Sequence, residues 1–433
     1  MLRWFFGAGV REEPKILRQN LSANMVDGAM YSLGMCFVSL QTVLPVLVHR
    51  ISGSSLAVGL IPVLWTAGFN FPQIFIANHV ERFAFKRTLF LRTAFFQRVP
   101  WFLLSLLLFF VVGRTESLTG LLLFFILFTL AAIAGSLCFP VWFDLIAKLT
   151  PVHFRGRLFG ARNLLGGVLG VLGGWIVKVV LGRLDFPTSY GVLFVLAVLC
   201  MAVSYWSLTL LREEFPSITR QPVPAAEYYR KLPKILKRHR NFRNFLISDA
   251  LLIAATMAGA FYAVHALQKF SLSESYAGIF TIVIMCSMIV GNALFGFMAD
   301  HFGHKMNLVL AAVFTAIACL VALCAPGPYL YLASFVGLAF QIGLSGISRL
   351  SIVAELCEEA ERPTYVALAN MVTSPVVLFG VVAGGIASAY GYEVVFAIAA
   401  LLAITSALWM AFKVDEPRGR GSRPFVQPVQ YES

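Results

Sequence analysis

Charged residues are scarce in this chain. Asp, Glu, Lys and Arg make up 13% of its 433 residues, whereas 59% are hydrophobic, and the mean hydropathy is +0.81. A soluble domain carries roughly 25% charged residues, because its surface must interact with water. The composition therefore excludes an ordinary soluble protein and predicts a chain whose helices lie in lipid.

Enzyme and metal-site motifs are also missing. The seven cysteines lie in or beside apolar runs without the spacing of metal ligands, so we interpret them as packing residues. The sequence has no nucleotide-binding loop, and no nucleophile–base pair stands out. We therefore predict no enzyme, no metal and no cofactor.

Long apolar runs dominate the sequence instead. A helix needs ~20 largely apolar residues to cross the hydrocarbon core of a bilayer. The sequence predicts twelve such spans, approximately Ser22–Val48, Leu56–Asn78, Leu89–Val112, Leu118–Ala147, Leu158–Leu181, Tyr190–Leu211, Phe245–Leu267, Tyr276–Ala299, Met306–Cys324, Tyr329–Val353, Val366–Tyr390 and Val394–Phe412. The predicted fold class is an all-α integral membrane protein.

Basic residues are distributed unevenly between the connecting segments. The net charge is +13, and Lys and Arg concentrate at both termini and after the second, fourth and sixth spans. These segments all fall on one side of a twelve-span chain, and positive charge marks the cytoplasmic side. We therefore predict a plasma-membrane protein with both termini in the cytoplasm, and no nucleic-acid partner.

The longest hydrophilic interval, Arg212–Asn244, divides the chain into two sets of six spans. We predict a first six-helix bundle over residues 1–211, a cytoplasmic linker over 212–244, a second bundle over 245–413 and a cytoplasmic tail over 414–433. The basic middle of the linker is compatible with binding along an anionic leaflet and equally with a solvated connection.

The two sets of spans echo each other weakly. A shift of about 219 residues places Gly59 on Gly278 and Lys86 on Lys305. Such repeats are typical of transporters whose binding site lies between the two repeats. In the fifth span, the glycine run Gly166–Gly174 indicates close helix packing rather than a role in coupling.

The stretch "GFMADHFGHK" follows the eighth span. It resembles the signature of the major facilitator superfamily, in which a glycine, an acid, a second glycine and two basic residues recur at fixed spacing. The resemblance implies two pseudo-symmetric six-helix bundles and a latch that stabilises one conformation, the outward-facing one. The latch residues are then Gly296, Asp300, Gly303, His304 and Lys305, with Glu81 and Lys86 left in the first half. We expect Gly296 to admit a neighbouring helix and Gly303 to form a tight turn; the alternative is charge that only sets topology.

Ionisable residues inside spans are functional candidates, because their insertion into lipid costs about 2.5–3.5 kcal/mol or more. Asp27 shares a helical stripe with Tyr31 and Gln41, and we expect Arg98 to pair with Asp27 or Asp144. The candidates for the substrate pathway or for coupling are Asp27, Tyr31, Gln41, Arg98, Asp144, Asp249, His265, Gln341, Ser345 and Arg349. Structural ion pairs remain the alternative for the acids, and an interfacial hydrogen bond remains the alternative for His265.

One loop on the predicted cytoplasmic side is acidic, whereas the other segments on that side are rich in Lys and Arg. Glu358, Glu359 and Glu361 follow the tenth span, and Arg155 and Arg157 follow the fourth. The family resemblance places these loops opposite each other, so we predict that they pair as a cytoplasmic gate in an outward-open state. Two unrelated solvated loops are the alternative.

The sequence thus predicts a monomeric secondary transporter that moves a small organic solute by alternating access. The apolar interior, rich in Phe and Met, favours an amphipathic or lipophilic solute, and we favour export over uptake. If transport is coupled to an ion, the ion that we consider is a proton. A membrane assembly factor or scaffold without transport activity, built on the same fold, is the alternative function.

Overall fold

The computed structural model describes residues 2–7, 10, 13–80, 83, 85–114, 117–216, 238–357 and 362–417, and within these ranges it contains helices and no strand. Both halves of the chain are built from helices that run the length of the molecule. The first half contains α1 (Leu2–Phe6), α2 (Lys15–Phe37), α3 (Val43–Ser52), α4 (Ser55–Val80), α5 (Arg87–Phe110), α6 (Ser117–Leu149), α7 (Val152–Arg183) and α8 (Thr188–Thr209). The second half contains α10 (Arg240–Thr256), η2 (Met257–Ala260), α11 (Tyr262–Lys269), α12 (Tyr276–Phe302), α13 (His304–Cys324), α14 (Pro328–Glu355), α15 (Arg362–Thr373), η4 (Ser374–Leu378), α16 (Phe379–Tyr390) and α17 (Tyr392–Lys413).

The helices confirm the all-α membrane fold. Among the described residues, ten helical segments are long and apolar enough to cross a membrane. The remaining two predicted spans correspond to α2 with α3, and to α4. Helix α2 contains Asn20, Asn24 and Asp27, all of them buried, so this span is polar because it faces the protein interior rather than lipid.

Three of the predicted spans are interrupted. The first breaks between the end of α2 at Phe37 and the start of α3 at Val43. The seventh contains the 3₁₀ turn η2, and the eleventh contains the 3₁₀ turn η4, which includes Pro375. Proline lacks an N–H group and clashes with the preceding turn, so it interrupts α-helical hydrogen bonding at that point.

Corresponding helices pair in the same way in the two halves. In the first half, α6 packs against α4 and α5, and α8 packs against α2 and α5. In the second half, α14 packs against α12 and α13, and α17 packs against α10 and α13. The weak sequence echo therefore corresponds to a repeated packing arrangement.

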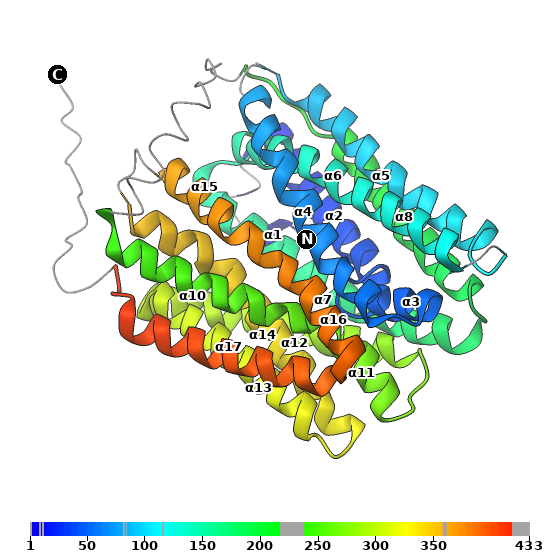
Figure 1. Ribbon diagram of the computed structural model, residues 1–433. Coiled ribbons are helices and arrows are strands. Elements are labelled where there is room, and N and C mark those ends of the chain that lie inside the picture. The colour runs from blue at the N-terminus through cyan, green and yellow to red at the C-terminus, as the bar shows by residue number, and fades with distance from the viewer. Residues whose placement is uncertain are drawn as a thin grey trace, which may run out of the picture.

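The halves contact each other mainly through two helix pairs, α7 with α12 and α4 with α16 (Figure 1). Glycines bring these helices together. A Cβ atom added to Gly278 would lie 2.3 Å from the backbone N of Lys178, and one added to Gly59 would lie 2.3 Å from the carbonyl O of Gly380. Only glycine permits such close approach between helix backbones. Within the glycine run of α7, a Cβ atom added to Gly174 would lie 2.9 Å from the carbonyl O of Gly278, so the packing interpretation of that run is confirmed.

The long helices run between two ends of the molecule, the terminal end and the far end. The terminal end is where α2 begins at Lys15 and α17 ends at Lys413. The far end is where α3 connects to α4 and α11 connects to α12. Helices α3 and α11 contact each other across the halves at the far end (Figure 1).

Candidate functional site

A cavity of about 580 Å³ lies between the two halves and is called the central cavity. It is lined by α2 and α7 from the first half, by α12 and α14 from the second, and by residues 39–41. Two predicted pathway residues, Tyr31 and Gln41, lie on its wall together with Met35, Cys36 and Met285. Among the described residues, no carboxylate, ammonium or guanidinium group lines this cavity.

A second cavity, of about 330 Å³, lies inside the first half and is called the aromatic pocket. Its wall contains rings from α4 and α6, and it shares Tyr31 and Met35 with the central cavity. Unlike the central cavity, it contains charged groups. The residues that line it are Asp27, Tyr31, Met35, Trp65, Phe69, Phe90, Ala94, Gln97, Arg98, Gly135, Cys138, Phe139, Trp142, Arg162 and Leu208.

Asp27 forms an ion pair with Arg162 of α7. The Nη2 atom of Arg162 lies 2.9 Å from Oδ2 of Asp27, and Ser204 Oγ donates a hydrogen bond of 2.7 Å to Oδ1. The guanidinium of Arg162 also lies over the ring of Trp142 at 5.1 Å. Both carboxylate oxygens of Asp27 are thus held by donors from helices distant in sequence.

The predicted pairing of Arg98 is wrong. Asp27 pairs with Arg162, and Asp144 pairs with Lys86. Arg98 instead donates hydrogen bonds to the carbonyl O of Met201 at 2.8 Å and to Ser204 Oγ at 2.8 Å. The lateral order of helices decides this outcome, because α7 brings Arg162 closer to Asp27 than α5 brings Arg98.

Sequence reasoning missed Arg162 because it was grouped with the loop cations. Its position inside the predicted fifth span provided the same signal that singled out Arg98. Its approach to α2 requires Gly28, since a Cβ atom there would lie 2.6 Å from Nε of Arg162. The Asp27–Gly28 pair is therefore the local feature that admits the arginine.

The second half contains a comparable buried ion pair. Arg349 of α14 lies 2.9 Å from Asp249 of α10 through its Nε atom. The same guanidinium donates to Asn370 Oδ1 and to Thr373 Oγ1 of α15, each at 3.1 Å. The predicted candidates Asp249 and Arg349 thus come together, and they join α10, α14 and α15.

Two predicted pathway residues of the tenth span, Gln341 and Ser345, form a polar stripe on α14 that does not line the central cavity. Gln341 donates a hydrogen bond of 3.1 Å to Ser345 on the same helix. Neither residue lines the central cavity, whereas their neighbours Ile342 and Gly346 do. The rotation of α14 therefore turns this stripe away from the space between the halves.

Polar contacts join the halves at the far end. The hydroxyls of Thr42 and Thr281 are 2.7 Å apart, and Ser55 Oγ donates to the hydroxyl of Tyr392 at 2.8 Å. Glu274 accepts from Tyr190 at 2.8 Å and lies 3.3 Å from Arg50. Where both partners belong to the described part of the chain, the side-chain hydrogen bonds and ion pairs between the halves all lie at this end.

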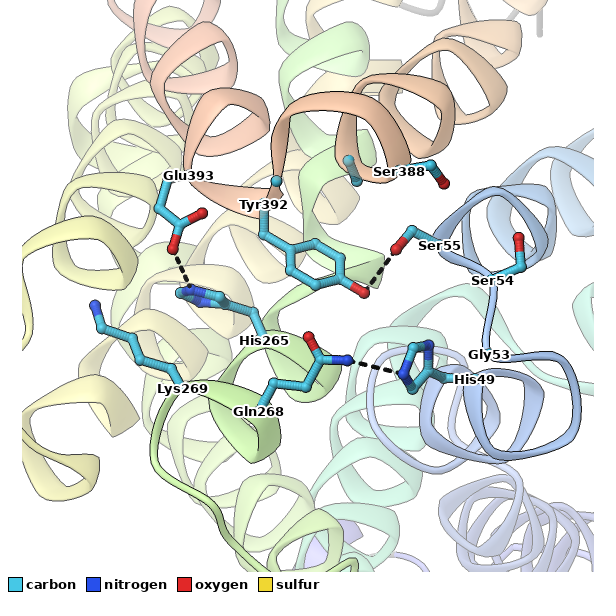
Figure 2. Close-up of a pocket in the computed structure, with 12 residues that line it drawn as sticks. His49, Gly53, Ser54, Ser55, His265, Gln268, Lys269, Ser388, Tyr392 and Glu393 are labelled. Carbon is cyan, nitrogen blue, oxygen red and sulfur yellow. Dashed lines mark hydrogen bonds and ion pairs between the residues drawn. The ribbon is translucent and has the colours of Figure 1, made fainter.

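Figure 2 shows the far-end cavity, an open space of about 760 Å³ between α3, α4, α11, α16 and α17. Gln268 Nε2 donates to His49 Nε2 at 2.8 Å across the two halves. His265 lies between Tyr331, whose hydroxyl is 3.0 Å from Nδ1, and Glu393, whose Oε1 is 3.5 Å from Nε2. The predicted candidate His265 thus belongs to a hydrogen-bonded cluster at the end of the bundle.

The family model described as Major Facilitator Superfamily matches residues 245–430. The fold resembles a mutant of the nucleoside transporter NupG, with 11% identity, 92% of this chain and 99% of that one covered, and a TM-score of 0.70. A D-xylose-proton symporter is similar, with 16% identity, 94% and 100% coverage, and a TM-score of 0.67.

The superfamily model thus matches the second half of the chain, and the fold of the chain is that of the solved transporters. A curated relative, described as a putative metabolite transport protein from Haemophilus influenzae, is 29% identical over 154 residues. That match covers 35% of this chain and 37% of the relative. The solved structures are too distant in sequence to establish more than the fold.

The superfamily signature of the first half contacts a carboxylate from beyond α8. Glu213 accepts hydrogen bonds from the backbone N of Lys86 at 2.9 Å and of Arg87 at 2.8 Å, at the start of α5. Lys148 Nζ lies 2.6 Å from the same carboxylate, and Lys86 Nζ bonds Asp144. Glu213 thereby caps α5 and neutralises charge at a helix N-terminus.

The second half repeats this arrangement beyond α17. Glu416 lies against Gly303, where an added Cβ would be 2.6 Å from its Oε1. Gly303 has φ +84°, so the tight turn predicted there is confirmed. Lys305 Nζ donates to the carbonyl O of Ala411 at 2.9 Å, and His304 Nδ1 lies 3.2 Å from Ser348 Oγ.

One part of the predicted latch is wrong. A Cβ atom added to Gly296 would meet nothing within 4 Å, so this glycine does not admit a neighbouring helix in the observed state. Asp300 is exposed at the end of α12. Glu81 lies outside the described residues, so its part in the latch stays a prediction.

The acids Glu213 and Glu416 were missed by the sequence analysis. Each follows the last apolar residues of a six-helix set, in "LREE" and in "VDEP". An asparagine in α2 and an asparagine in α10 hold the same segments. Asn20 bonds the backbone of Arg212, and Asn241 bonds the backbone of Asp415. The repetition of this spacing was the signal available.

The structure describes only the arginines of the predicted cytoplasmic gate. Arg155 donates to the carbonyl O of Ala147 at 2.6 Å, and Arg157 donates to the carbonyl O of Phe6 at 3.0 Å. Both arginines thus bond within the first half. Their predicted partners Glu358, Glu359 and Glu361 lie outside the described residues, so the gate stays a prediction.

Proposed function

We propose that this chain is a member of the major facilitator superfamily and a secondary transporter of a small organic solute, which it exports across the plasma membrane by alternating access. The observation that carries the proposal is the central cavity between two similarly packed halves that are bonded together at one end. A solute in that cavity is released when the bonded end separates and the other end closes.

The proposal includes the orientation of the molecule in the membrane. The clusters of Lys and Arg lie at the terminal end, which the charge rule assigns to the cytoplasm. Both termini are then cytoplasmic, and the observed arrangement is the inward-facing state. The division into bundles over residues 1–211 and 245–413, joined by the linker 212–244, places the moving boundary between the two bundles.

Coupling to a proton would use an acid that is now paired with a cation. Asp27, Asp144 and Asp249 are held by Arg162, Lys86 and Arg349. Proton coupling is therefore expected only if the observed pairs separate during the cycle.

Cysteines already present provide the test. Cys36 lines the central cavity, Cys138 lines the aromatic pocket, and Cys286 is exposed on α12 outside both. Single-cysteine variants in proteoliposomes are labelled with a maleimide while a panel of amphipathic solutes is screened for transport. A transported solute is expected to slow labelling of Cys36 or Cys138, with Cys286 unchanged.

The outcome that contradicts transport is equally specific. If no solute is moved and no solute protects either cysteine, while the chain co-purifies stably with a membrane complex, the scaffold function replaces the proposal.

A further inference from the structure

The aromatic pocket carries an uncompensated positive charge. Asp27 and Arg162 form a neutral pair on its wall, and Arg98 is a second cation on the same wall. Among the described residues, Asp27 is the only acid that lines the pocket, and both of its oxygens are already bonded to Arg162 and Ser204. The net charge of the lining groups is therefore one positive unit.

Arg98 has spare hydrogen-bonding capacity. A guanidinium has five N–H donors. The acceptors of Arg98 within hydrogen-bond distance are the carbonyls of Met201 and Ala94, Ser204 Oγ, and Gln97 Oε1, the last at a long 3.4 Å. At least one N–H of Arg98 therefore has no protein acceptor in the described part of the chain.

Tyr31 supplies a second donor to the same space. Its hydroxyl oxygen accepts a hydrogen bond of 2.9 Å from Gln97 Nε2 and lines both the aromatic pocket and the central cavity. No acceptor for its own proton is present among the described residues. Tyr31 and Arg98 thus place an O–H and an N–H donor on the wall of one pocket.

The rest of the wall suits a ring system. Trp65 and Phe69 of α4 stack with their centroids 6.3 Å apart, and Phe139 of α6 lies 5.7 Å from both Phe69 and Trp142. A free inorganic anion would leave these faces without a partner, whereas an aromatic solute would pack against them. The volume of about 330 Å³ lies at the lower end of the ~300–1,000 Å³ range of ligand pockets.

We propose that the aromatic pocket binds an aromatic organic anion, with its carboxylate on Arg98 and Tyr31 and its ring packed against the aromatic side chains of α4 and α6 that line the pocket. This inference rests on the proposed function and names the class of solute. The shared Tyr31 and Met35 connect the pocket to the central cavity, which is the route by which the solute enters and leaves.

The test measures the thermal stability of the purified full-length protein in detergent, because a ligand that binds only the folded state raises Tm. The probes are 2-naphthoate, the neutral 2-naphthamide and the cationic 2-naphthylmethylamine, with chloride and inorganic phosphate at matched ionic strength. We expect 2-naphthoate to raise Tm and the other probes to leave it nearly unchanged. Equal shifts from all three naphthyl compounds, or an equal shift from an inorganic anion, overturn the proposal.

Variants identify the carboxylate partner. Arg98→Gln should weaken the Kd for 2-naphthoate about ten- to a hundredfold, since a hydrogen bond to a charged group is lost. Arg92→Gln, an exposed position on the same helix, serves as the control and should leave Kd unchanged. Tyr31→Phe keeps the ring and removes the hydroxyl, so it should weaken Kd less and still tests the site if Arg98→Gln does not fold. Undiminished binding in either variant overturns the assignment.

Separate measurements of binding and of transport distinguish a failure of the anion site from a failure of the proposed transport function. Binding of 2-naphthoate without transport in proteoliposomes counts against the proposed function and supports the anion site. Transport of neutral or cationic solutes without any preference for carboxylates supports the proposed function and overturns the anion site.

Discussion

Thr42 donates a hydrogen bond of 2.7 Å to Thr281, across 239 residues of sequence and between the two halves of the chain. The direction follows from Thr281, whose single hydroxyl proton is already donated to the carbonyl O of Ala277 at 2.9 Å. Both hydroxyls are fully buried. This bond is therefore a part of the far-end closure that water does not replace without separation of the halves.

Removal of that bond should favour opening of the far end. Thr42→Val keeps the shape of the side chain and removes one neutral hydrogen bond of about 1 kcal/mol, which corresponds to about a fivefold shift in a two-state equilibrium. Cys36 in the central cavity should then react faster with an impermeant maleimide added outside the cell. The control is Thr405→Val, an exposed threonine bonded only to its own helix. Equal rates in the two variants would show that the Thr42 bond does not hold this end closed.

Glu213 should stabilise the first half through the start of α5. Glu213→Gln weakens the bonds to the backbone of Lys86 and Arg87 and removes the ion pair with Lys148. Hydrogen bonds to a charged group contribute about 1.5–3 kcal/mol, so a clear fall in Tm is expected. The adjacent exposed Glu214→Gln is the matched control and should change Tm little. A small effect of both would argue that the cap does not contribute to stability.

The buried ion pair of the second half should depend on both partners. Asp249→Asn leaves Arg349 with its charge inside the bundle, and breaking such a pair destabilises by about 3–5 kcal/mol. The double variant Asp249→Asn with Arg349→Gln should be more stable than the single variant, because no charge is left unpaired. The exposed Asp185→Asn should have almost no effect. Chemical unfolding in detergent measures the three.

The contact between α7 and α12 should tolerate no side chain at Gly278. Gly278→Ala would place Cβ 2.3 Å from the backbone N of Lys178 and 2.4 Å from the carbonyl O of Gly174, and backbone atoms cannot rotate away. We expect a lower Tm and loss of transport. Gly296→Ala on the same helix meets nothing within 4 Å, and alanine favours helix by about 1 kcal/mol, so its Tm should be equal or higher. A loss of stability in Gly296→Ala would instead indicate a close approach in another state.

The fold was predictable because its signals are local. The length of each apolar run marks a span, and the placement of Lys and Arg predicts the side of the membrane on which each connecting segment lies. The interval Arg212–Asn244 separates two similar sets of six spans. The interruptions at residues 38–42 and at η2 escaped the analysis, because hydropathy reports burial in lipid and not the continuity of backbone hydrogen bonds. The third interruption, η4, contains Pro375, a residue type that breaks helices.

The sequence predicted several residues of the site, but it predicted less well which residues bond to one another. Asp27, Tyr31 and Arg98 were found, and all three line the aromatic pocket. The partner of Asp27, however, is Arg162, 135 residues away, and the acid that caps α5 lies beyond α8. Sequence spacing relates residues along one helix, whereas these contacts depend on which helices are neighbours and how each is rotated.

The sequence by itself determined that this chain crosses a membrane as two similar helical sets, because the insertion of backbone and charge into lipid permits few alternatives. Tertiary structure alone decided which acid meets which arginine, which faces line a cavity and which end is bonded shut. Those choices depend on contacts between helices far apart in sequence, where differences of a few ångströms select one partner over another.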